Sequence, residues 1–216
     1  MNTSAITYPS PTTEERYVDG VTHVIGLAAV AAGCTAFFIY SDALGGPALI
    51  VSVVIYAVCA ILSAGVSAAY HQLPMHDWRV FLRRVDHAAI YAVIAGTFTP
   101  LLIQVGTTWA YWILTATWAF AVPGMLFKMF GTNLDSRWSL ISYVGMGWFG
   151  VLALPDFWSD LPRGALVGIA GGAVFYSIGT LFYRNKTMRY RYAIWHAFGL
   201  LGAGSFFAAI WISLFA

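Results

Sequence analysis

Residues 47–70, PALIVSVVIYAVCAILSAGVSAAY, decide the fold class of this chain. The stretch contains no Asp, Glu, Lys or Arg, and at 1.5 Å per residue it forms a helix about 36 Å long. A hydrocarbon core of about 30 Å needs about 20 apolar residues, so this helix is long enough to cross a membrane. The 216 residues are 60% hydrophobic and 9% charged, whereas soluble domains carry about 25% charged residues. The sequence therefore predicts an integral membrane protein.

Seven stretches of this kind follow one another with short connections. They cover residues 20–40, 47–70, 86–105, 108–127, 138–154, 164–182 and 192–214. We therefore expect an all-α membrane protein, a single seven-transmembrane-helix bundle over residues 14–216. Residues 1–13 contain neither a basic residue nor an apolar core, which argues against a signal peptide and is typical of a mobile tail. Thr12 and Glu15 have the spacing of a capping box, which predicts a helix start ahead of the first span.

The basic residues are distributed unevenly between the connections. The segment before the first span and the even-numbered connections hold ten of the eleven Lys and Arg residues, namely Arg16, Arg79, Arg83, Arg84, Lys128, Arg137, Arg184, Lys186, Arg189 and Arg191. Only Arg163 falls on the other side. Because basic residues favour the cytoplasmic side of a membrane, we expect the N-terminus in the cytoplasm and the C-terminus outside.

Four polar residues lie near the ends of otherwise apolar spans: Ser67, His71, Asp86 and His196. The predicted topology puts all four at the cytoplasmic face, although they are far apart in the sequence. Ser67 and His71 are four residues apart, so they share one helix face. Ionisable groups are costly to bury in a membrane and default to a functional role. We therefore expect a buried polar site near this face.

Two histidines and a carboxylate from three helices suit a bound Zn²⁺. Asp86 is then either a direct ligand or the group that orients and deprotonates a water activated by the metal. Ser67 is expected to hydrogen-bond that water or an oxyanion. The alternative interpretation is a packed polar cluster without metal, in which these residues satisfy one another or backbone carbonyls.

Two further histidines, His23 and His87, are candidates for the same site. His23 begins the first span, with Asp19 four residues earlier on the same face. It can line the same cavity, but packing at the membrane interface is the favoured interpretation. His87 adjoins Asp86 but points about 100° away around the helix, so one ion is not expected to bind both.

Several short motifs together carry a family resemblance. They are EERYVDGVTHVIG at 14–26, Ser67-x-x-Tyr70-His71, RRVDH at 83–87 leading to AGTFTP at 95–100, and AIWH at 193–196. The combination resembles the haemolysin III proteins, the bacterial branch of the progestin and adipoQ receptor (PAQR) family, over nearly all seven spans. The resemblance implies a seven-helix protein of a bacterial plasma membrane with a cytoplasmic N-terminus.

The resemblance also implies a metal site. The family looks similar to alkaline ceramidases, and in both a zinc near the cytoplasmic face is held by one His of the second span and two of the seventh. Carried over to this sequence, His71 and His196 become zinc ligands. Ser67 and Asp86 become the supporting residues around the metal.

This chain departs from the family pattern at two positions. The seventh span of the family has His-x-x-x-His, but the position four before His196 is Tyr192. Asp19 stands where the pattern usually has Asn. A phenol must lose its proton to bind a metal well and is a poorer ligand than neutral imidazole. The third ligand is therefore open between Tyr192, Asp86, His23 and water, and a retained but atypical site is favoured over a weakened site or none.

Three functions follow from these observations. The first is zinc-dependent hydrolysis of a lipid amide or ester, and the second is non-enzymatic sensing or regulation of membrane lipid. The third is haemolysin-type membrane disruption, which is the least favoured because the spans offer too few polar residues for an aqueous lumen. A membrane lipid is thus the expected partner, and the net charge of +2 is too small to suggest nucleic-acid binding.

Gly164, Gly168 and Gly172 give the sixth span a face for close helix contact, either within the bundle or in an oligomer.

Overall fold

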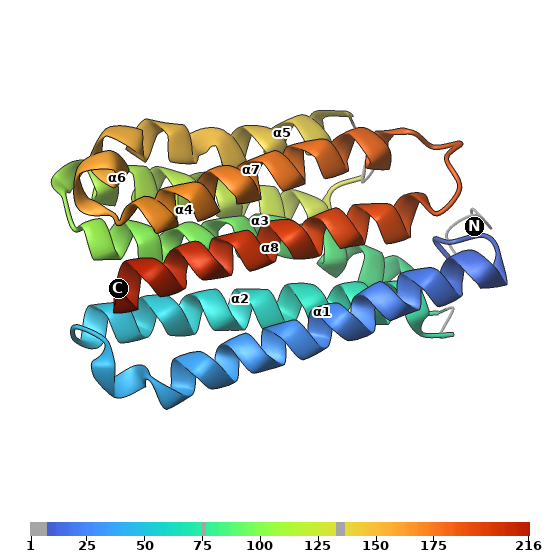
Figure 1. Ribbon diagram of the computed structural model, residues 1–216. Helices are drawn as coiled ribbons and strands as arrows, with labels where there is room; N and C mark the ends of the chain where they lie inside the picture. The colour runs from blue at the N-terminus through green and yellow to red at the C-terminus, as the bar shows by residue number, and fades with distance from the viewer. Residues whose placement is uncertain (1–7, 75–76, 133–136) are drawn as a thin grey trace.

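The computed structural model describes residues 8–74, 77–132 and 137–216, and in Figure 1 their helices lie side by side as one bundle. Within these ranges, seven helical segments are long and apolar enough to cross a membrane, which confirms the predicted seven-helix fold. The elements are α1 (Thr13–Ile39), η2 (Ser41–Ala43), α2 (Pro47–Gln72), α3 (Arg79–Val105), α4 (Thr108–Phe130), α5 (Arg137–Gly147), η3 (Trp148–Ala153), α6 (Leu154–Asp160), α7 (Arg163–Arg184) and α8 (Arg191–Phe215). Residues 1–7 of the predicted tail lie outside the described residues, and the division at residue 13 stays a prediction.

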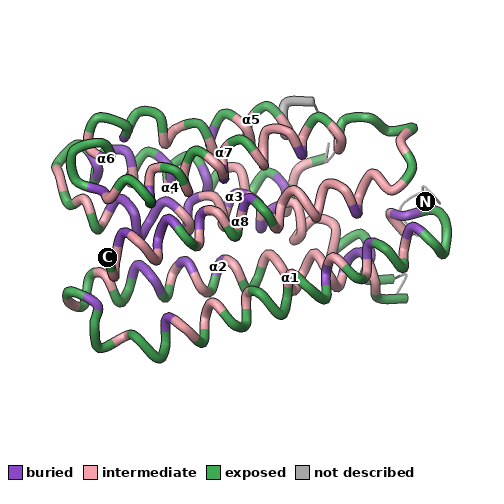
Figure 2. The backbone as a smooth tube through the Cα atoms, in the orientation of Figure 1, coloured by how far each residue is buried: buried purple, intermediate pink, exposed green. Residues whose placement is uncertain are grey.

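The bundle is arranged around α3. In the most apolar window of α3, 56% of the residues are buried, against 11% in α1, which lies at the edge of the bundle. Figure 2 shows the same contrast, with buried segments in the interior and exposed ones along the outer side of α1. Many exposed side chains of the spans are apolar, for example Val24 and Val51. Apolar outer faces are what a helix bundle presents to lipid.

The fifth span differs from its prediction in regularity. The sequence predicted one helix over 138–154, whereas the chain here passes through α5, the 3-10 segment η3 and α6, which together form one candidate span, Ser139–Asp160. Gly145, Gly147 and Gly150 weaken the α-helix at this point. A Cβ added at Gly150 would lie 2.7 Å from the Phe98 ring, so glycine also permits η3 to approach α3 closely.

The first turn of α1 is tied to the first turn of α8. Thr12 and Glu15 form the predicted capping box, which satisfies free N–H groups at the helix start. Glu15 Oε1 also accepts a hydrogen bond from the backbone N–H of Tyr190 at 3.0 Å, and Glu14 forms an ion pair with Arg189. These contacts bring the polar start of α1 next to that of α8, although the two lie at opposite ends of the sequence.

The end of α2 is held by a buried arginine of α3. Arg79 is 1% exposed, and its guanidinium donates hydrogen bonds to the carbonyl oxygens of Tyr70 and Leu73. The last carbonyls of a helix have no partner within the helix and carry the negative end of its dipole, so a cation here is doubly favourable. His71 lies in the same turn, and the contact therefore fixes the backbone that carries it.

The glycine face of the sixth span packs inside the bundle, between α7 and α8. A Cβ added at Gly168 would lie 2.8 Å from the carbonyl oxygen of Ser205, and one at Gly172 would lie 2.4 Å from the Phe206 ring. Gly164 of α7 likewise faces Ile212 of α8. This surface is therefore used within the chain, and an oligomer, if one forms, must use another.

Candidate metal centre

Four ionisable side chains from three helices meet at the end of the bundle where α1 and α8 begin and α2 ends. Asp19, His23, His71 and His196 each offer a ligand atom, and these atoms all lie within 4.8 Å of one another. Asp19 is fully buried, and the two histidines His23 and His71 are 7% and 3% exposed. A cluster of this composition away from water is costly unless its members pair with one another or with an ion.

Asp19 is the centre of the cluster. Its Oδ2 lies 2.8 Å from Nδ1 of His71, and its Oδ1 lies 2.6 Å from Nδ1 of His196. Both distances are those of hydrogen bonds in which an imidazole N–H donates to the carboxylate. One side chain of α1 thus connects α2 to α8.

His23 completes the cluster one helical turn after Asp19. Its Nε2 lies 3.7 Å from Oδ1 of Asp19, as expected for residues four apart on one helix face. Its ring centroid is 4.3 Å from that of His196 and 5.2 Å from that of His71. The favoured expectation for His23, packing at the membrane interface, is therefore wrong, because α1 crosses close enough to α2 and α8 to bury the ring among the other members of the cluster.

The donor set fits a transition-metal ion. Nε2 of His23 is buried and has no hydrogen-bond partner among the described residues. A buried polar atom without a partner costs about 1–3 kcal/mol, which a bound ion would remove. Three imidazoles and one carboxylate are a donor set that zinc accepts, with ligand atoms about 2.0–2.2 Å from the metal. Asp19 would then exchange its two short hydrogen bonds for the ion.

Of the four residues singled out in the sequence, His71 and His196 come together, with ring centroids 4.6 Å apart. Asp86 lies next to this pair rather than in it. It interacts electrostatically with both histidines, and its Oδ2 is 3.5 Å from Nδ1 of His87. Ser67 is half-buried on α2, one turn before His71. The catalytic roles expected for Ser67 and Asp86 stay predictions.

His87 and Tyr192 lie around the cluster in different ways. Nδ1 of His87 is 2.8 Å from the carbonyl oxygen of Arg83, one turn earlier on α3, and His87 does not belong to the four-residue donor set. The Tyr192 ring packs edge-on against His71, with centroids 5.1 Å apart. Tyr192 therefore touches the cluster through its ring, at the position where the family pattern has a second histidine.

Asp19 was not among the metal ligands predicted from the sequence. The signal was present in the Asp19-x-x-x-His23 spacing, which puts a carboxylate and an imidazole on one helix face. At the start of a first span, however, such a pair is equally compatible with a solvated helix end. Its meaning depends on where α1 crosses the other helices.

Comparison with known proteins agrees with this architecture. A family model described as Haemolysin-III related matches residues 12–207. The chain is 30% identical to the hemolysin-3 homolog of Bacillus subtilis (strain 168) over 200 residues, which cover 92% of this chain and 94% of that protein. It is 27% identical to hemolysin-3 of Bacillus cereus over 198 residues, 91% of this chain and 90% of the other. It is also 27% identical to heptahelical transmembrane protein 1 of Arabidopsis thaliana over 155 residues, 62% of this chain and 47% of the plant protein.

Proposed function

The chain belongs to the haemolysin III-related family, as its motifs predicted. On this basis we propose that it binds zinc and hydrolyses a lipid amide or ester. The ligands in this proposal are Asp19, His23, His71 and His196. Catalysis at such a site needs a further coordination position for water, to which zinc can expand. The chain is a multi-pass integral membrane protein. We assign it to a bacterial plasma membrane, with the metal site near the cytoplasmic face.

One observation carries the metal part of the proposal. The cluster joins three imidazoles to a fully buried carboxylate, and it leaves Nε2 of His23 buried without a hydrogen-bond partner among the described residues. A purely structural polar cluster would be expected to satisfy all of its buried atoms. A buried nitrogen without a hydrogen-bond partner therefore supports a fifth participant, and a cation is the one that three nitrogens and a carboxylate favour.

The catalytic part rests on what the neighbouring residues can do. Bound at this site, zinc supplies Lewis acidity, which activates water and polarises a carbonyl group near neutral pH. Asp86 accepts the proton of the attacking water and returns it to the leaving group, a role supported by its electrostatic interaction with His71 and His196. Ser67, one turn from His71, donates a hydrogen bond to the oxyanion.

Turnover by the purified chain in lipid nanodiscs tests the proposal. Fatty acid released from an N-acyl sphingoid lipid and from a glycerophospholipid is measured by mass spectrometry, and His71→Ala is expected to abolish the release. Ser67→Ala is expected to lower the rate about a hundredfold, the usual effect of losing one oxyanion donor. Ser63→Ala, one turn earlier on the same face of α2, is the matched control and should keep the rate. Release that continues unchanged in folded His71→Ala protein would rule out this mechanism.

A second function has one observation in its favour. Asp19 already hydrogen-bonds two of the three histidines, so much of the cluster is satisfied without an ion. This arrangement suits a cluster that only holds α1, α2 and α8 together, in a non-enzymatic sensor or regulator of membrane lipid. Under that reading the same nanodiscs would show lipid bound to the chain and no product from either lipid.

A further inference from the structure

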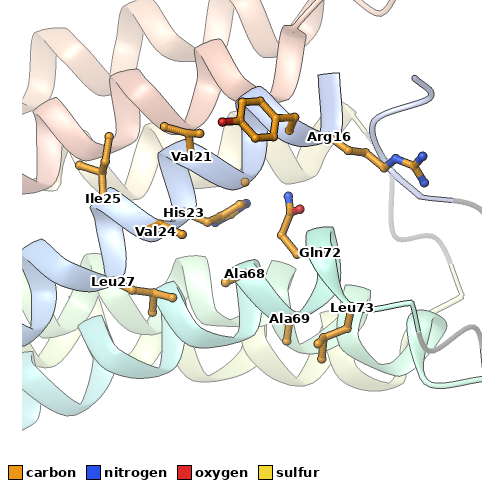
Figure 3. A pocket seen from close by; sticks show the side chains of 12 residues that line it. Arg16, Val21, His23, Val24, Ile25, Leu27, Ala68, Ala69, Gln72 and Leu73 are labelled. Carbon is orange, nitrogen blue, oxygen red and sulfur yellow. The ribbon is translucent and has the colours of Figure 1, made fainter. Parts of the chain in front are cut away.

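A groove runs along the outside of the bundle between α1 and α2. Its volume is about 710 Å³, which is within the range of small-ligand pockets. Figure 3 shows His23 and Gln72 pointing into the space between the two helices, with apolar side chains further along it. Because His23 also belongs to the cluster of Asp19 and three histidines, the groove leads from the lipid-facing surface to that cluster.

The groove has a polar end and an apolar end. Arg16 and Gln72 line it where α1 begins and α2 ends, and Val24, Leu27 and Ala68 line it deeper in the span. An amphiphile from the adjoining leaflet has the same order of polarity, with a polar head at the membrane surface and an acyl chain below it. The groove therefore fits such a molecule lying parallel to the helices.

The polar end contains a hydrogen-bonding group that the described residues do not satisfy. Nε2 of Gln72 is buried and has no hydrogen-bond partner among the described residues. The amide lies against Gly20, where a Cβ would be 3.1 Å from Oε1, so glycine leaves the space that the Gln72 side chain occupies. An unsatisfied amide N–H₂ in a groove calls for an acceptor oxygen from a ligand.

Arg16 supplies positive charge at the same end. Its guanidinium donates a hydrogen bond to Thr13 Oγ1 at 2.9 Å and lies over the Tyr8 ring. In the described part of the chain, no ion pair joins it to a carboxylate. The charge is therefore available to an anion at the mouth of the groove.

The way into the cluster from the helix ends is partly covered. Ser10 is 3% exposed, and its hydroxyl lies 3.5 Å from Oδ2 of Asp19, so the segment before α1 lies against the cluster. The α1–α2 groove, in contrast, is open along its length to the surface that faces lipid. The groove therefore lets a ligand reach the cluster laterally, from the lipid-facing surface.

We propose that the α1–α2 groove is a binding site for an anionic glycerophospholipid. One acyl chain lies along Val24, Leu27 and Ala68, and the phosphate accepts hydrogen bonds from Gln72 and pairs with Arg16. This inference goes beyond the proposed function, because it requires neither a bound metal nor turnover.

Native mass spectrometry of the purified full chain tests the site. Phosphatidylglycerol and phosphatidylcholine with identical acyl chains are added at equal concentration, and we expect phosphatidylglycerol to bind at least fivefold better. Arg16→Gln should lower its binding about fivefold, the usual contribution of one cation to anionic lipid binding. Gln72→Leu should also lower it, and Ala68→Phe, which fills the apolar end, should remove it.

Two matched variants control for general effects. Lys186→Gln removes an exposed cation outside the groove, and Val58→Phe enlarges an exposed residue of α2 that does not line it; both should bind phosphatidylglycerol as the wild type does. Zinc-free protein should also bind it normally, so failure of the metal proposal leaves this result unchanged. Equal binding of the two lipids would overturn the proposal, as would a preference for phosphatidylglycerol that survives Arg16→Gln and Ala68→Phe. Binding of oleate in place of phosphatidylglycerol would overturn it as well.

Discussion

Oδ1 of Asp19 lies 2.6 Å from Nδ1 of His196, which joins α1 to α8 across 177 positions of the sequence. The same carboxylate contacts His71 of α2 through its other oxygen. Asp19 therefore occupies the point where the three helices meet, in a position to replace a ligand that the family pattern draws from the seventh span. We infer that the Asp19 carboxylate takes over the ligand role of the family's histidine, whose position is occupied here by Tyr192. This replacement is the ligand exchange tested below.

That exchange predicts a specific pattern of compensation. Asp19→Asn removes a ligand, so zinc affinity should fall at least tenfold, the scale on which metal sites respond to losing a supporting group. Tyr192→His supplies a neutral imidazole next to His71, where the Tyr192 ring now packs. The double variant should therefore bind zinc much better than Asp19→Asn alone. Competition with a chelator of known affinity measures all three, and a double variant as weak as Asp19→Asn would refute the exchange.

Close packing between α7 and α8 predicts the effect of a single methyl group. A Cβ at Gly172 would lie 2.4 Å from the buried Phe206 ring, so Gly172→Ala forces the two helices apart. We expect a loss of about 1–3 kcal/mol in the free energy of unfolding, as for other overpacked cores. Gly171→Ala is the control, since its Cβ would meet Ser205 at 3.6 Å, an ordinary contact. Denaturant unfolding in detergent compares the two, and equal stabilities would contradict this packing.

The orientation in the membrane is a separate prediction from the basic residues. In a chain with Cys34 and Cys59 replaced by alanine, Asp42→Cys and Asn185→Cys each put one thiol on an exposed connection at opposite ends of the bundle. With the N-terminus in the cytoplasm, a membrane-impermeant maleimide added to intact cells should label position 42 only. Position 185 should react after the cells are opened. The reverse pattern would invert the topology and place the metal cluster at the outer face.

The helices could be predicted from the sequence because each span is an apolar run of sufficient length, and that property is local. His71 and His196 could be selected for the same reason, since an ionisable residue in an apolar run is conspicuous. The break in the fifth span could not be predicted from apolar length alone, because it depends on glycines that let η3 approach Phe98. Apolar length is the same whether the backbone is α-helical or partly 3-10.

Asp19 and His23 were harder to interpret for a physical reason. At the first turns of a first span, polar residues are ordinarily solvated, and the pattern of α1 gives no indication of which helices it crosses. Their burial depends on tertiary contacts, among them the hydrogen bond from the backbone N–H of Tyr190 to Glu15 that draws α1 and α8 together. The apolar run of each span determines its position in the sequence. Which side chains form the site depends instead on where the helices cross one another.

The most direct test of the account is the zinc content of the purified protein, measured by inductively coupled plasma mass spectrometry. The wild type is compared with Asp19→Asn, His71→Ala and His196→Ala, and with His87→Ala as a histidine outside the cluster. Thermal unfolding of each variant verifies that it is folded. We expect about one zinc per chain in the wild type and in His87→Ala, with most of it lost in the other three. A wild type that holds no zinc after incubation with the metal, or a folded His71→Ala that keeps all of it, would rule out the proposed metal centre.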